Sequence, residues 1–264
     1  MSNALAPVLS ALVLWWASTG ALIWLVGRPR DSHPWIALGA TGTMAAATVA
    51  MVALRPDTSI AAAYAGFIAG LALWAWHETM FLLGYISGPR RSPCPPGLKT
   101  WPRFIASTQT VLHHEIAIVM HGLLIAALSI GAENQIAAYT FALLWFMRVN
   151  AKLVVFLGAP NISDQFLPAH LTYLSTYFGK RRVTAFFPVF ITVAIAAATV
   201  LVYAAATLPA GFAATGAWLI AALAVLAVIE HWALVLPIPD AALWAWIKPA
   251  QKQETAPASD GAHN

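Results

Sequence analysis

Residues 185–206 read AFFPVFITVAIAAATVLVYAAA and contain no charged side chain. About 20 apolar residues in a helix cross the hydrocarbon core of a bilayer, which is roughly 30 Å thick. This stretch is therefore long enough to span a membrane. Residues 213–236, AATGAWLIAALAVLAVIEHWALVL, have a similar length and character, apart from Glu230 and His231 near the end.

Further apolar stretches of this kind precede these two, at residues 5–26, 35–54, 60–86, 104–130 and 134–157. The chain is 60% hydrophobic and only 9% charged, whereas soluble domains carry about 25% charged residues. We therefore predict an all-α polytopic membrane protein, a bundle of seven transmembrane helices. Residues 1–250 form the predicted transmembrane domain, and the polar residues 251–264 a disordered cytoplasmic tail. The first seven residues lack Lys and Arg, so we expect the first helix to be retained rather than cleaved as a signal peptide.

The positions of the basic residues predict the orientation of the bundle. Of the 14 Lys and Arg residues, all but Arg55 lie in or beside the linkers after the first, third, fifth and seventh stretches. Cytoplasmic loops are enriched in Lys and Arg, so we predict an external N-terminus and a cytoplasmic C-terminus. This topology accounts for the net charge of +4, and we expect no nucleic-acid binding. The single cysteine, Cys94, excludes an internal disulfide.

Two predicted cytoplasmic loops have distinctive sequences. Residues 88–97 hold too many prolines for a helix and are interpreted as a connector. In the second loop, Leu167, Leu171, Leu174 and Phe178 share one helical face. They predict a short amphipathic helix, which lies either on the inner membrane surface or against the bundle.

Ionisable residues at membrane depth are the main candidates for function, because they are costly there unless they have a partner, a cavity or a ligand. They form three groups, namely His77 with Glu78, then His113, His114, Glu115 and His121, and finally Glu230 with His231. The three His–Glu pairs lie roughly six to ten residues inside the cytoplasmic ends of their predicted helices. At 1.5 Å of rise per residue, they therefore lie about 9–15 Å below the inner surface. Pairs at similar depth on three helices can converge on one centre.

Three interpretations of these residues remain open. Glu78, Glu115, Glu230, His77, His114 and His231 could bind iron, zinc or manganese, as in di-metal helix bundles. Alternatively, a single imidazole among His77, His113, His114, His121 and His231 could be the axial ligand of haem or of a chlorophyll-type magnesium. In the structural interpretation, each Glu pairs with a His of a neighbouring helix.

Three polar residues near the end of the fifth stretch have their own alternatives. Arg148, Asn150 and Lys152 could simply extend toward the interface and interact with the helix C-terminus. They could also form a site for an anionic group together with Asn161 and His170.

Several motifs, in order, resemble a known family. They are Trp76-His-Glu-Thr-Met-Phe-Leu-Leu-Gly84, Gly88-Pro-Arg-Arg-Ser-Pro-Cys-Pro95, His113-His-Glu115, Leu144-Trp-Phe-Met-Arg-Val-Asn-Ala-Lys152, Phe156-Leu-Gly-Ala-Pro-Asn161 and Leu167-Pro-Ala-His-Leu-Thr-Tyr173. This run, over roughly residues 70–190, is similar to the photosynthetic complex assembly proteins of purple bacteria, of the PuhE type.

The resemblance implies a protein of the bacterial inner membrane, cytoplasmic or intracytoplasmic, that assists assembly of the reaction centre and its light-harvesting antenna. It also implies a cell that makes bacteriochlorophyll, and it brings no established active site. The expected function is therefore an assembly factor that handles bacteriochlorophyll near the inner leaflet, with reaction-centre or light-harvesting subunits as partners. The alternative is a membrane-embedded His/Glu metalloenzyme that acts on a lipid-soluble substrate.

Overall fold

The computed structural model describes residues 2–162, 164, 167–179 and 183–237. Within these ranges the chain is helical, with loops and turns between the helices. The long helices are α1 (Ser2–Val26), α2 (His33–Ala53), α3 (Ile60–Leu82), α4 (Thr100–Ser129), α5 (Ile136–Leu157), α6 (Phe186–Thr207) and α7 (Phe212–Ala233). All seven are long and apolar enough to cross a membrane. The predicted seven-helix membrane bundle is confirmed.

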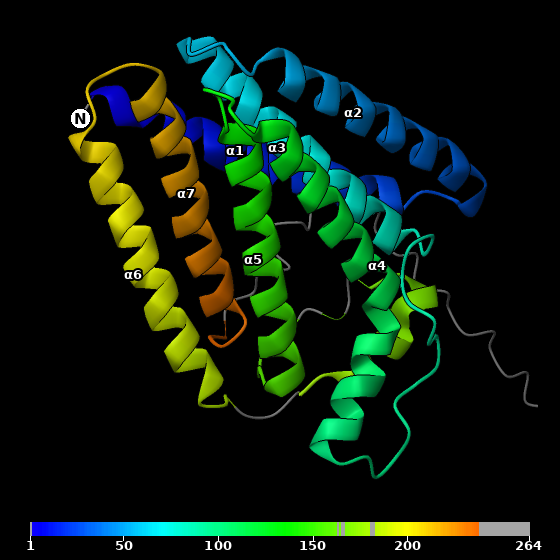
Figure 1. The fold of residues 1–264 in the computed structure, drawn as a ribbon. Coiled ribbons are helices and arrows are strands. Elements are labelled where there is room, and N and C mark those ends of the chain that lie inside the picture. The colour runs from blue at the N-terminus through cyan, green and yellow to red at the C-terminus, as the bar shows by residue number, and fades with distance from the viewer. Residues whose placement is uncertain (1, 163, 165–166, 180–182, 238–264) are drawn as a thin grey trace, which may run out of the picture.

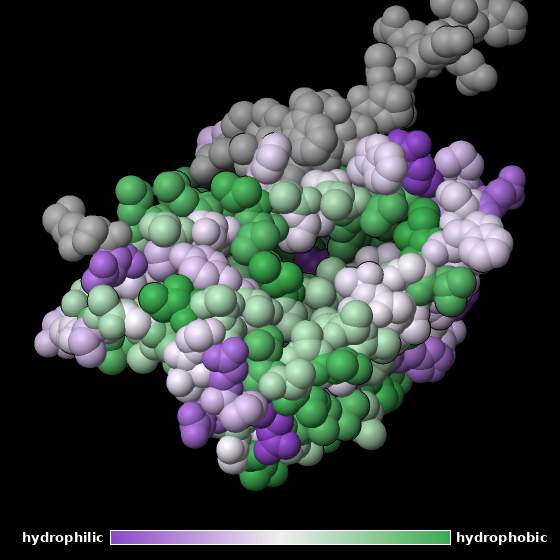
Figure 2. All heavy atoms as spheres, turned by 90° about the horizontal axis from the view of Figure 1, so that it is seen from above, coloured by the Kyte–Doolittle hydropathy of each residue, from purple (hydrophilic) through white to green (hydrophobic). Residues whose placement is uncertain are grey.

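Helices α3 and α7 form the centre of the bundle. In the most apolar 18-residue stretch of each of these two helices, half of the residues are buried, compared with 11% in α1 and in α2. Helix α7 packs between α1 and α6, and α3 packs against α5 on one side and α2 on the other (Figure 1). Figure 2 shows one face of the molecule, where apolar side chains cover much of the surface and hydrophilic ones gather in separate groups toward the edges.

Small residues allow α3 and α5 to approach closely. A Cβ atom on Gly70 would lie 2.6 Å from the Cβ of Thr140 and 2.8 Å from the carbonyl oxygen of Ala137. Close approach of this kind is the usual role of a GxxxG motif inside a membrane protein. Asn134, just before α5, adds a hydrogen bond from its side-chain amide to the carbonyl of Ala62, at 3.1 Å.

Helix boundaries differ from the prediction by up to four residues at several ends. Helix α3 ends at Leu82 rather than at residue 86, because Gly84 adopts φ +81° and turns the chain back. Helix α4 begins at Thr100, earlier than predicted, and α7 ends at Ala233, before the predicted 236. The basic residues 180–182, 248 and 252 and the predicted tail 251–264 lie outside the described residues.

The predicted amphipathic segment packs on the bundle. It is a 3-10 helix, η3 (Ala169–Tyr177), rather than an α-helix. Its buried residues Leu171 and Leu174 contact Phe81 at the end of α3. The apolar face therefore covers protein, which decides between the two alternatives for this segment. The proline-rich loop 88–97 contains no helix, as predicted.

Candidate functional site

The loop after α3 docks on α4 through its backbone. The carbonyl of Ser87 accepts a hydrogen bond from the His114 N–H at 2.9 Å, and the Arg90 N–H donates to the carbonyl of Gln109 at 3.3 Å. A Cβ on Gly88 would lie only 2.1 Å from that Gln109 oxygen. Helix α4 is visibly bent in Figure 1. Groups that insert into the backbone hydrogen bonds of a helix are a known cause of bends. Here the loop after α3 bonds the backbone of α4 at Gln109 and at His114.

Two ion pairs connect α5 to its neighbours. Nη2 of Arg148 lies 2.8 Å from Oε2 of Glu78 on α3, and the Lys152 ammonium pairs with Glu115 on α4. The structural interpretation of the sequence paired each Glu with a His, and for these two carboxylates that pairing is wrong. Their partners are two cations one helical turn apart on α5. That i, i+4 spacing was the signal in the sequence, because it places both cations on one face.

The histidines of α3 and α4 come together. His77 Nε2 and His121 Nδ1 share a hydrogen bond of 2.8 Å. The His77 and His114 ring centroids lie 6.3 Å apart, and Phe141 packs against the edges of His77 and His121. Both ring nitrogens of His114 are buried without a hydrogen-bond partner. An unpaired buried polar atom is costly, so His114 is the imidazole with most to gain from a ligand.

The other predicted residues lie apart from this cluster. His231 is buried against Phe190 of α6, with ring centroids 4.8 Å apart, and its Nδ1 bonds the Ala227 carbonyl at 2.7 Å. His113 and Glu230 are exposed on their helices. Among the described residues, no three His, Cys, Asp or Glu side chains are grouped so that they could hold a metal ion. The metal ligand set remains a prediction.

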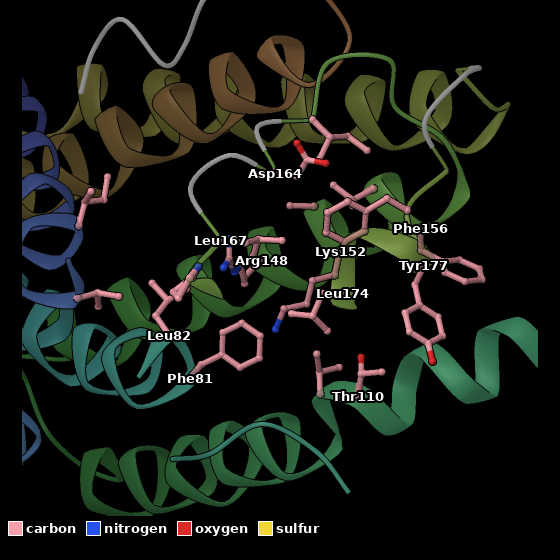
Figure 3. Close-up of a pocket in the computed structure, with 18 of the residues that line it drawn as sticks. Phe81, Leu82, Thr110, Arg148, Lys152, Phe156, Asp164, Leu167, Leu174 and Tyr177 are labelled. Atoms are coloured by element: carbon pink, nitrogen blue, oxygen red, sulfur yellow. The ribbon is translucent and has the colours of Figure 1, made fainter. Parts of the chain in front are cut away.

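A cavity of about 760 Å³ opens beside the ion pairs, a size typical of small-molecule sites. Its wall comes from the ends of α1, α3, α5 and α7, the first three turns of α4, and residues 162, 164 and 167–178 of the described chain (Figure 3). The aromatic side chains that line it are Trp24, Phe81, Phe156, Tyr177 and Phe178. Most of the lining is apolar, so the cavity suits a flat or extended hydrophobic body.

Charged side chains occupy defined places in this wall. Arg148 and Lys152 line the cavity, as does Arg28, whose guanidinium lies 3.9 Å from the Trp24 ring. Asp164 supplies a carboxylate from the opposite loop. In Figure 3 the Lys152 amine points toward Phe81, and it lies 5.9 Å from the centre of that ring.

The remaining members of the predicted anionic-group site have structural roles. The Asn150 amide donates to the Phe146 carbonyl at 2.7 Å. The Asn161 amide donates to the carbonyls of Ala233 and Leu236, and so holds the end of α7. His170 packs beside the Gly84 turn, where burial lowers the pKa of its imidazole. Arg148 and Lys152 are therefore the members that face the cavity.

The ring of Phe81 lies between the cavity and the imidazole cluster. Phe81 lines the cavity and also contacts His114, with ring centroids 4.7 Å apart. Thr110, one turn before His114 on α4, lines the cavity as well. His114 thus lies directly behind the wall.

Comparison with known proteins gives two matches. A family described as "Protein of unknown function (DUF3623)" matches residues 1–255. A Rhodobacter capsulatus protein, described as an uncharacterised 30.4 kDa protein in the puhA 5′ region, is 38% identical over 197 residues. The alignment covers 73% of this chain and 72% of the relative. No solved structure matches significantly.

Proposed function

The chain belongs to the DUF3623 family of proteins of unknown function, and on that premise we propose that it assists assembly of photosynthetic reaction-centre and antenna complexes. Two observations support this proposal. The motifs of residues 70–190 resemble photosynthetic complex assembly proteins, and a relative is encoded in the puhA 5′ region. The protein acts in the inner membrane of a purple bacterium, with the cavity on the cytoplasmic side.

In this proposal the cavity holds bacteriochlorophyll or one of its intermediates. The observation that carries it is the placement of His114, whose two ring nitrogens are buried without partners behind the Phe81 wall of an apolar cavity. The cavity rings suit the faces of a macrocycle, and an imidazole nitrogen suits its metal. When bound, the pigment supplies the metal, and the chain supplies an apolar enclosure and a nitrogen ligand.

The metalloenzyme alternative has less support. It needs Glu78 and Glu115 as metal ligands, and both carboxylates already pair with cations of α5. Metal binding would leave Arg148 and Lys152 as unpaired charges at membrane depth, which is costly.

Two measurements in a phototrophic host test the proposal. Deletion of the gene should lower the amounts of reaction-centre and antenna complexes, measured by membrane absorption, and the intact gene should restore them. Purification in mild detergent should yield protein with bound pigment. The His114→Gln variant should bind less pigment. The control variant His231→Gln, which changes another buried imidazole, should bind as much as the unchanged protein. Unchanged complexes after deletion would contradict the assembly role. A pigment-free protein from pigment-rich cells would contradict only the pigment site.

A further inference from the structure

The charges around the cavity are arranged asymmetrically. Arg148 and Lys152 line the cavity, but their partners Glu78 and Glu115 are not among the residues of its wall. Each ion pair is thus oriented with its positive member toward the cavity. Arg28 adds a third cation to the wall, against the one carboxylate of Asp164 among its described residues. The interior therefore favours a negative group.

The two cations of α5 retain free hydrogen-bond donors. The Arg148 side chain is 40% exposed, whereas that of Glu78 is 11% exposed, so Arg148 is the more open member of the pair. A guanidinium has several N–H donors, and the bond to Glu78 uses only Nη2 of Arg148. Lys152 likewise uses one ammonium donor on Glu115. Both can bond a further anion without releasing their Glu partners.

We propose that the cavity binds an amphiphile with a free carboxylate, whose acid group bonds Arg148 and Lys152 while its apolar body lies among Phe81, Phe156 and Tyr177. Charge-assisted hydrogen bonds are strong in a site of this kind because little water competes for them. For the pigment this inference rests on the proposed function. It then specifies the tetrapyrrole acid, before esterification with a long-chain alcohol, rather than the esterified pigment.

Binding of matched acids and esters to the purified full-length protein tests this inference. The probes are pheophorbide and its methyl ester, followed by fluorescence anisotropy in mild detergent, with oleate as a competitor. Pheophorbide carries no metal, so ligation by His114 does not contribute to its affinity. The acid should bind at least about tenfold more tightly than the ester, which corresponds to one charge-assisted hydrogen bond.

Matched variants assign the effect to the cavity cations. Arg148→Gln should weaken the acid about tenfold and leave the ester unchanged. Lys99→Gln removes an exposed charge that lies outside the cavity wall, and should change neither affinity. If Arg148→Gln does not fold, Glu78→Gln replaces it. That variant removes a competing carboxylate and should tighten binding of the acid alone.

The possible outcomes separate this inference from the proposed function. Equal affinities for acid and ester would overturn the inference and leave the pigment site standing. If oleate binds in an Arg148-dependent way and neither tetrapyrrole does, the anionic site is supported, and its extension to a tetrapyrrole acid is overturned. If none of the three binds, the inference is overturned and the cations serve only the two ion pairs, whereas the pigment site is still decided by pigment content after purification from the phototrophic host.

Discussion

The ring of Phe81 lies with its centroid 4.7 Å from that of the His114 imidazole, at an interplanar angle of 39°. The same ring forms part of the cavity wall. A side chain of the cavity wall thus packs directly on a buried imidazole that has no hydrogen-bond partner. Rotation of that side chain would uncover one face of His114 toward the cavity.

Phe81→Ala should expose the His114 imidazole to the cavity. Because the ring no longer covers the ligand nitrogen, we expect a zinc tetrapyrrole to bind more tightly and to show the absorption shift of axial ligation. Titration of Phe81→Ala and of Phe81→Ala/His114→Gln with the zinc compound measures this effect. The double variant should lose the shift, and a shift that persists in it would assign the ligand elsewhere. Removal of a buried Phe also costs roughly 3–5 kcal/mol of stability, so thermal unfolding is recorded in parallel.

Removal of one partner of the Arg148–Glu78 pair should destabilise the protein more than removal of both. Glu78→Gln leaves a cation at membrane depth with no counter-charge, and we expect a cost of about 1–3 kcal/mol, reduced by the partial exposure of Arg148. Arg148→Met/Glu78→Gln should recover part of that loss. Thermal unfolding of the two single variants and the double variant in detergent gives the coupling energy. Additive losses would mean that the pair does not contribute as a unit.

Gly88→Ala should disrupt the docking of the loop on α4. The added Cβ would lie 2.1 Å from the Gln109 carbonyl oxygen, so backbone must move on one side. We expect a loss of about 2–4 kcal/mol and faster proteolysis of the 83–99 loop. Gly39→Ala on α2 is the control, because no other group lies within 4 Å of the new Cβ. That change should be neutral or slightly stabilising. Equal stability of both variants would contradict the tight docking.

The predicted orientation can be tested with reporter fusions. A fluorescent protein fused after residue 264 should fold and fluoresce, because the positive-inside pattern places the C-terminus in the cytoplasm. Alkaline phosphatase fused after Arg55 should be active, because that residue lies in the predicted external loop between α2 and α3. Arg55 bonds the carbonyl of Ile130 at 2.6 Å, so the 130–135 loop shares that side. The reverse pattern of activities would invert the topology.

The transmembrane helices could be predicted from sequence because hydrophobic length is a local property. Which polar groups meet could not be predicted, because this depends on the rotation of each helix about its axis. The side chains of residues 77 and 78 point about 100° apart around the axis of α3. The orientation of α3 therefore directs Glu78 toward Arg148 and His77 toward His121. The bend in α4 could not be predicted either. The loop that bonds α4 at this point has no periodic sequence pattern from which its path could be inferred.

The contact between Gly70 and Thr140 has a mechanical consequence. Two backbones packed at this distance cannot slide past each other without steric overlap, and separating them would lose close van der Waals contacts, so α3 and α5 act as a single stiff frame. Arg148 and Glu78 are both on that frame and keep their relative position. In contrast, only 17% of the residues in the most apolar 18-residue stretch of α4 are buried. Any widening of the cavity to admit a ligand must therefore come from displacement of the walls that α4, α1 and the η3 segment supply around this fixed frame.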